Sequence, residues 1–168
     1  MISFFHPNSK NSGFACSFSQ SKTGDIYASL IKQSSYDTEK KIGGFLESRN
    51  DPQKHVNIKL SLVEASAILQ TIDRAQPYST VHDTDRELKS IVFNLWQTKP
   101  ENPTDKPIIK GYTFSINIKD KEDSTKSNAF FIGLSFAEGR LIREFLIYSL
   151  NNAFSINQEN FSANQPAK

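Results

Sequence analysis

The sequence predicts an α+β protein made of a duplicated unit, in which an antiparallel β-sheet is followed by one helix. Three observations indicate this fold class. The stretch IKLSLVEASAILQTI, from Ile58, has a near copy, IGLSFAEGRLIREFL, from Ile132. Each copy changes from alternating apolar residues to an apolar spacing of three and four, and each places Ser-x-x-Glu at the change. We therefore expect two sheets, each backed by one helix, with the other face of each sheet left available.

Both helices are expected to begin at a capping box. Ser61 stands three residues before Glu64, and Ser135 stands three residues before Glu138. In this motif the serine oxygen accepts a hydrogen bond from the first helical turn, and the glutamate accepts one from the N–H of the serine. The predicted helices span residues 62–74 and about 136–151.

The segments between these signals alternate as half-buried strands do. The Pro-rich run 98–107 and the charged run 121–128 are expected to be connections, and paired glycines in the segment 40–49 suggest a bend or bulge. The predicted strands lie near residues 13–20, 25–33, 40–49, 55–61, 87–97, 111–120 and 129–135.

The domain organisation follows from these elements. Residues 1–12 are expected to form an N-terminal arm, and residues 155–168, which are polar and lack periodicity, a flexible C-terminal tail. Between them we expect one domain, residues 13–154, made of the repeats 13–76 and 80–154.

Composition restricts the classes of protein to consider. The chain has 168 residues, with 20 Lys and Arg against 18 Asp and Glu, so the net charge of +2 says little about partners. A single cysteine, Cys16, excludes an intramolecular disulfide and a cysteine-based zinc site, and fits a reducing compartment. No run approaches the ~20 apolar residues needed to cross a membrane. We expect an intracellular, cytoplasmic protein, in the host cytoplasm if it is viral, without membrane association.

Catalytic motifs are missing from the sequence. His6, His55 and His82 have no metal-binding spacing, and no nucleophile elbow, phosphate loop or dinucleotide motif occurs. Cys16 alternates with two phenylalanines, which favours a small buried side chain over a nucleophile. The acidic run HDTDRE, from His82, is interpreted as solvated surface rather than a metal site. We expect no enzyme, no cofactor and no metal.

Binding residues leave a clearer pattern. On the strand faces opposite the predicted helices, aromatic side chains alternate with basic ones. Aromatic rings on which bases stack, among cations that meet phosphates, are typical of single-stranded nucleic-acid binding. The aromatic candidates are Tyr27, Phe45, Trp96 and Phe131, and the basic candidates are Lys40, Lys41, Arg49, Lys59, Lys89 and Lys110.

From residue 13 to 154 this organisation resembles the Whirly family of single-stranded DNA-binding proteins, and the related fold of the transcriptional coactivator called positive cofactor four. The resemblance rests on the doubled LS-[LF]-x-E junctions, on GGFLESRNDP…HVNIKLS and on HDTDRELKSIVFNLWQ…GYTFSINIKD. Where Whirly proteins carry K-G-K-A-A-L, this chain reads KNSGFACSF and keeps only Lys10.

The resemblance implies a function. It implies a Whirly-like protein that binds single-stranded DNA with little sequence preference, in replication, recombination, repair or transcription, and that forms a homo-oligomer, either a dimer or a tetramer. The alternatives are an RNA-binding protein of the same fold, and a protein-interaction or structural module. Two copies in one chain could supply the symmetric pair that smaller relatives obtain by dimerising.

Overall fold

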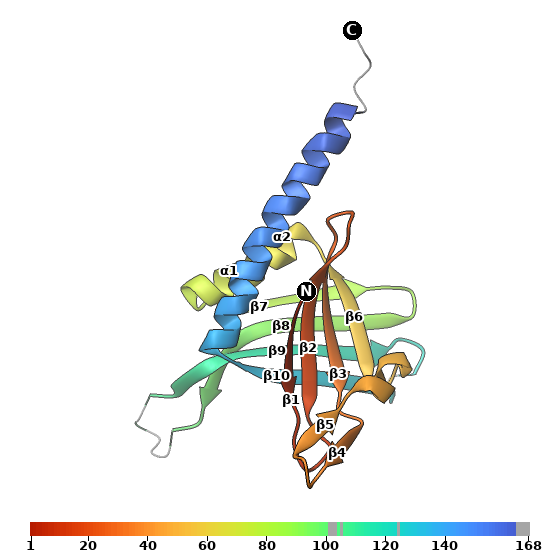
Figure 1. The fold of residues 1–168 in the computed structure, drawn as a ribbon, viewed down its shortest axis with the longest axis vertical. Coiled ribbons are helices and arrows are strands. Elements are labelled where there is room, and N and C mark those ends of the chain that lie inside the picture. The colour runs from red at the N-terminus through yellow and green to blue at the C-terminus, as the bar shows by residue number, and fades with distance from the viewer. Residues whose placement is uncertain (101–103, 105, 124, 164–168) are drawn as a thin grey trace.

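The computed structural model describes residues 1–100, 104, 106–123 and 125–163 as an α+β fold with two four-stranded antiparallel sheets (Figure 1). In the first sheet the strand order is β1 (Ile2–His6), β2 (Phe14–Gln20), β3 (Ile26–Lys32) and β6 (His55–Leu60). In the second it is β7 (Tyr78–Asp83), β8 (Glu87–Thr98), β9 (Ile108–Asp120) and β10 (Ser127–Ser135). The predicted fold class is confirmed.

The two helices begin where the sequence predicts. The helix α1 (Leu62–Arg74) follows β6, and α2 (Phe136–Ala163) follows β10. At each start the serine hydroxyl accepts a hydrogen bond from the N–H of the glutamate three residues later, at 3.2 Å for Ser61 and 3.3 Å for Ser135. In return each glutamate carboxylate accepts from the serine N–H at 2.7 Å. Both capping boxes are therefore complete.

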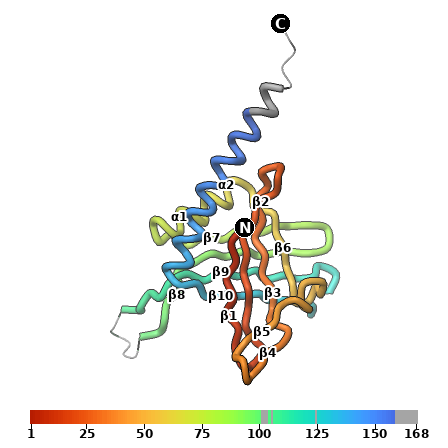
Figure 2. The backbone as a smooth tube through the Cα atoms, in the orientation of Figure 1, coloured from red at the N-terminus to blue at the C-terminus, as the bar shows by residue number. Residues whose placement is uncertain are grey.

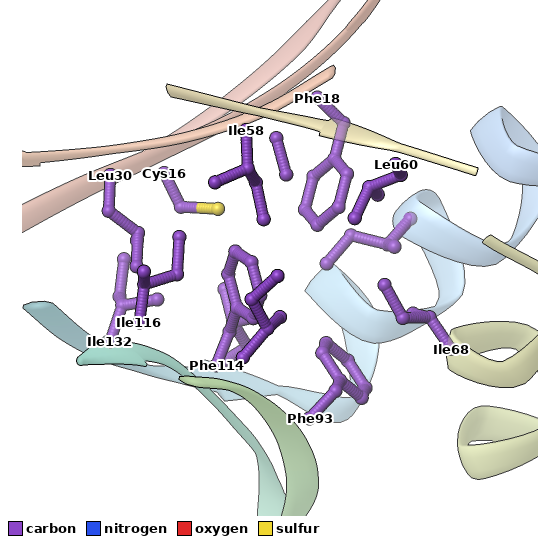
Figure 3. Close-up of a cluster of buried hydrophobic side chains, with 14 of the residues drawn as sticks. Cys16, Phe18, Leu30, Ile58, Leu60, Ile68, Phe93, Phe114, Ile116 and Ile132 are labelled. Carbon is purple, nitrogen blue, oxygen red and sulfur yellow. The ribbon is translucent and has the colours of Figure 1, made fainter. Parts of the chain in front are cut away.

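One hydrophobic core joins the two repeats. Phe18 on β2 and Phe114 on β9 face each other with ring centroids 5.7 Å apart, and the inner face of each sheet contributes to the same cluster (Figure 3). Ile68 from α1 and Ile142 from α2 enter this cluster, and the two helices contact each other. In addition to the helices that back them, the two sheets cover one another across this core. Their outer faces point away from this core.

Several segments differ from the expectation. Residues 2–6, predicted to belong to an N-terminal arm, form the edge strand β1 and pair with β2. Residues 78–83, which include part of the acidic run, form the edge strand β7. Helix α2 continues to Ala163, so most of the predicted flexible tail is helical, and residues 164–168 lie outside the described residues. Figure 2 shows α2 extending well beyond the sheets.

The segment between β3 and β6 departs most from the repeat. It forms a small separate sheet of β4 (Ser35–Asp37) and β5 (Ile42–Gly44), followed by the short 3₁₀ helix η1 (Leu46–Asn50). The predicted strand 40–49 therefore does not belong to a main sheet. We call residues 35–50 the covering segment, since its residues Gly43, Phe45, Leu46 and Arg49 lie against the outer face of the first sheet.

Candidate nucleic-acid interface

The outer face of the second sheet carries two aromatic candidates close together. Trp96 on β8 and Phe131 on β10 are 37% and 48% exposed. The Trp96 ring lies on Gly133, where a Cβ atom would come within 2.9 Å of the indole. Because Gly133 and Phe131 are two residues apart on β10, their positions share one face of the sheet. The two rings thus form one open aromatic surface.

Polar side chains lie between and beside these rings. Thr113 and Ser115 on β9 pair with Gly133 and Phe131 in the register, so they occupy the same face. Lys119, further along β9, is exposed on that face as well. No element covers this face within the residues that the structure describes (Figure 1). The surface offers stacking, hydrogen-bonding groups and one cation.

The outer face of the first sheet carries Tyr27 on β3 and Lys59 on β6, which are paired in the register. Tyr27 is half-buried. The Lys59 ammonium lies 2.7 Å from the Asp25 carboxylate. This hydrogen-bonded pairing raises the pKa of Lys59 and lowers that of Asp25. Lys59 is therefore reliably charged, but its charge is already matched by a neighbour.

Phe45 differs from the expectation of an open ring. It is only 8% exposed, and its edge meets Phe5 of β1 at a centroid distance of 5.7 Å. Phe45 belongs to the covering segment and lines a pocket on the first sheet rather than an open strand face. Arg49, at the end of η1, lines the same pocket.

The remaining basic candidates are scattered. Lys40 lies in the turn between β4 and β5, 3.9 Å from Asp37, and Lys41 follows it with a φ of 55°. Lys89 on β8 is half-buried beside Glu87 at 3.0 Å, and it lies on the same inner face as buried Ile91 rather than on the outer face, where it was expected. Lys110 is exposed at the start of β9, next to the residue that pairs with Trp96. The structure thus brings Lys110 near Trp96, Arg49 near Phe45 and Lys59 near Tyr27, and does not join all ten candidates in one groove.

Two contributions were missed from the sequence. The first is Gly133, against which the Trp96 ring packs. An isolated glycine in a strand often marks a place where another group approaches the backbone closely. Ile31 and Ala15 form an apolar row on the outer face of the first sheet, under the covering segment. Apolar residues at these outward positions, next to the inward-facing Cys16 and Leu30, could have signalled a sheet that is partly covered on both faces.

Two of the three histidines, His6 and His82, contact the capping boxes instead of lying free on the surface. His6 on β1 and Glu138 on α2 lie 2.6 Å apart, and so do His82 on β7 and Glu64 on α1. Each pair joins the edge strand of one repeat to the helix of the other. Burial raises the pKa of each glutamate, but the serine N–H and the histidine outweigh it and hold that pKa below its ordinary value.

The described residues give little support for a reactive cysteine, a metal site or a membrane-spanning helix. Cys16 is buried, and burial raises the pKa of its thiol far above the ordinary range, as expected for a packing residue. Within the described ranges no group of three or more His, Cys, Asp or Glu side chains is arranged to hold a metal ion. Nor does a helix in that part of the chain combine the length and apolarity that crossing a bilayer requires.

Comparisons with solved structures show which proteins share this architecture. PBF-2, described as a plant transcriptional regulator, matches with a TM-score of 0.61 at 12% identity, over 99% of this chain and 88% of that one. WHY3 from Arabidopsis thaliana gives 0.60 at 10% identity, over 96% and 94%. The trypanosomal MRP1/MRP2 structure gives 0.54 at 14% identity, over 92% and 86%. No family model and no curated protein sequence matches. The chain has the Whirly-like fold.

Proposed function

We propose that this Whirly-like chain binds single-stranded nucleic acid with little sequence preference, and that its ligand is single-stranded DNA in replication, recombination, repair or transcription. The observation that carries the proposal is the open aromatic surface of Trp96 and Phe131. The structural similarity to PBF-2, a plant transcriptional regulator, also supports a role in nucleic-acid binding.

The surface explains why binding would tolerate different sequences. Every base has a π-face, so stacking on Trp96 and Phe131 needs no particular hydrogen-bond pattern. Thr113 and Ser115, beside the rings, offer hydroxyl groups that accept or donate and so suit any base edge. Lys110 and Lys119 would meet backbone phosphates at either side of the rings.

The first sheet would add a second contact region. Tyr27 would stack one further base, with Lys59, Arg49, Lys40 and Lys41 as phosphate partners. Because Lys59 and Lys40 have acidic neighbours, we expect each of them to contribute less than an unmatched cation.

A fluorescence titration tests the proposal directly. Trp96 is the single tryptophan of the chain, so quenching by oligo-dT reports on this surface alone. We expect saturable quenching whose affinity falls steeply with salt as counterions are released. The Trp96→Phe and Trp96→Ala variants lack the fluorophore, so their binding is measured by the anisotropy of labelled oligo-dT. Trp96→Phe should keep most of the affinity of the wild type for oligo-dT, whereas Trp96→Ala should lose most of it. Salt-independent binding, or equal affinity for both variants, would exclude this surface.

A competition experiment separates DNA from RNA, the alternative ligand of the same fold. Unlabelled oligo-dT and oligo-U of equal length should displace the labelled strand at different concentrations if the 2′-hydroxyl is sensed. Displacement by oligo-U at the lower concentration would assign the protein to RNA instead.

Exposed apolar residues on α2 favour self-association as a second role. Leu141, Tyr148 and Phe154 are each more than half exposed on this helix, whose far end extends past the sheets. We propose a homo-oligomer, a dimer or tetramer, in which copies meet through α2. Sedimentation of the wild type and of Leu141→Ser/Tyr148→Ser tests this, and an unchanged sedimentation coefficient would exclude the helix as the interface. A pull-down after nuclease treatment would reveal a protein-interaction module that needs no nucleic acid.

A further inference from the structure

A pocket of about 290 Å³ lies between the outer face of the first sheet and the covering segment. Ala15 and Ile31, paired on β2 and β3, are part of its lining, together with Phe5 and Phe45. Ala15 belongs to the outward-facing set of β2, yet it is only 4% exposed, because the covering segment shields it. The pocket therefore exists because of the one connection that the second repeat lacks.

Hydrogen bonds fix the covering segment in place. The side chain of His55 on β6 contacts the Arg49 carbonyl oxygen through Nδ1 at 2.7 Å, and the Ser29 hydroxyl through Nε2 at 2.8 Å. The buried amide of Gln33 donates to the Ser35 carbonyl at 2.8 Å and accepts from the Gly13 N–H at 3.1 Å. The walls are thus attached to the sheet at both ends of the segment, and the cavity is pre-formed.

The lining differs from end to end. Phe45 and Ile31 supply flat and apolar surface, whereas Ser3 and Ser17 place hydroxyl groups on the neighbouring row of the same face. Arg49 has the only charged side chain in the lining, and that side chain has no ion-pair partner among the described residues. A ligand that fits has a flat ring, hydrogen-bonding groups at the ring edge and an anionic group. A volume near the lower end of the ~300–1,000 Å³ usual for ligand pockets limits it to one such unit.

We propose that this pocket binds one nucleotide, with its base between Phe45 and the Ala15–Ile31 row and its phosphate at the Arg49 guanidinium. Arg presents parallel N–H groups that match phosphate oxygens. The nucleotide comes either from the bound strand, with one base turned out of the run, or from the free pool. If the nucleotide comes from the bound strand, this inference rests on the proposed function. If it comes from the free pool, the inference does not depend on that function.

The test uses the full chain and three small probes, namely thymidine 5′-monophosphate, thymidine and inorganic phosphate, titrated by calorimetry. We expect the monophosphate to bind more tightly than either part. Ala15→Leu fills the cavity without changing charge and should weaken its binding by about 5- to 100-fold, the range for one stacked base. The matched control is Ser90→Leu, at the register-equivalent position on β8 of the second repeat, which should leave monophosphate binding unchanged.

A second variant protects the test against misfolding. If Ala15→Leu shows no cooperative thermal unfolding, and so is not properly folded, Ser17→Leu takes its place. This variant fills the pocket from the end where the serine hydroxyls lie, and should give the same loss of monophosphate affinity. Arg49→Ala should weaken the monophosphate but not thymidine, and Arg49→Lys should restore part of the difference. Equal monophosphate affinity in the wild type and the folded pocket-filling variant would overturn the inference.

Oligo-dT distinguishes this failure from failure of the proposed function. Weaker oligo-dT binding by the pocket-filling variant supports capture of a base from the strand. Unchanged oligo-dT binding, with no monophosphate binding by the wild type, overturns the pocket and leaves the proposed function standing. Monophosphate binding without oligo-dT binding by the wild type supports the pocket with free nucleotide as its source, and removes the proposed function.

Discussion

The two repeats share one plan and differ in one connection. Each runs from an edge strand through two further strands to a last strand and a capped helix. In the second repeat a short charged turn joins β9 to β10, whereas in the first the covering segment lies between β3 and β6. The first sheet therefore has a partly covered outer face with a pocket, and the second has an open face with aromatic rings.

Side chains on equivalent strands match this difference. On the first sheet the register aligns Phe5, Ala15 and Ile31 in one apolar row, in which Ala15 is buried, Ile31 is half-buried and Phe5, at the edge, is 60% exposed. The equivalent row of the second sheet carries Val81, Ser90 and Asn117, of which Ser90 is half-buried and the other two are exposed. The comparison shows how the two copies of a duplicated unit can come to differ in function. The presence or absence of one connecting segment decides whether an outer face has an apolar row with a pocket or stays exposed.

The largest expected effect concerns what the repeats share. Phe18 and Phe93 occupy equivalent positions and are fully buried in one core. Phe18→Ala and Phe93→Ala should each lower the free energy of unfolding by about 3–5 kcal/mol, because each leaves a cavity where a ring was. Denaturant unfolding, followed by Trp96 fluorescence and by far-UV circular dichroism, measures both.

The shape of the transition is the decisive part of that experiment. Because Trp96 reports on the second repeat, Phe18→Ala in the first repeat should shift the fluorescence and dichroism curves together. Fluorescence that unfolds at the wild-type midpoint in Phe18→Ala would show that the repeats are separate units, contrary to the single core.

The sequence predicts those parts of the fold in which local chemistry and packing agree. Capping boxes need only residues three apart, so both helix starts are predicted correctly. Strand β7 was missed because an edge strand with an alternation of half-buried and exposed residues resembles a solvated loop. The end of α2 was missed because nothing in its polar sequence shows that an exposed helix continues.

The candidate site was predictable by residue type but not by arrangement. Aromatic and basic residues on outward positions led to Trp96, Phe131 and Tyr27, all of which lie on outer faces. Phe45 was placed on a strand face, whereas it lies in the covering segment, because the alternating pattern there is too short to distinguish a strand from a 3₁₀ turn. Which cations have acidic neighbours depends on distant pairings that the sequence pattern does not contain.

The next largest effect compares how much the outer face of each sheet contributes to oligo-dT binding. Trp96→Ala and Phe131→Ala should each weaken oligo-dT binding by about 1–3 kcal/mol, the usual value of one stacked base. Tyr27→Ala on the first sheet should cost less, because Tyr27 is half-buried and its neighbour Lys59 is paired with Asp25. Anisotropy with labelled oligo-dT measures all three, and a larger loss for Tyr27→Ala would reverse the assignment of the main surface.

A smaller effect tests the platform under Trp96. Gly133→Ala places a Cβ within about 3 Å of three indole carbons, so the ring must lift from β10. We expect about 1 kcal/mol less stability, the lower end of the range for overpacking because the exposed ring can shift, together with a shifted Trp96 emission maximum. Ala129→Val, on the same face of β10, is the control and should leave the emission unchanged. An unmoved emission maximum in Gly133→Ala would remove Gly133 from the site.

The smallest effect compares the two histidine–glutamate pairs that join the repeats. In both, the pKa of the glutamate lies below its ordinary value in the folded chain. Each pair therefore stabilises the fold above the ordinary glutamate pKa, and the stabilisation is lost as pH falls through the lowered folded pKa. Glu64→Gln and Glu138→Gln should each reduce stability at neutral pH by about 1 kcal/mol, near the value of a helix cap.

The pairs should not be equal. The Glu64 side chain is 11% exposed and that of Glu138 is 20% exposed, so solvent screens the second pair more. Glu64→Gln should therefore flatten the acid limb of the stability profile more than Glu138→Gln, measured by urea unfolding at a series of pH values. The double variant should flatten it further by the sum of both effects, because the pairs share no residue. A wild-type acid limb in both single variants would show that neither pair contributes to holding the repeats together.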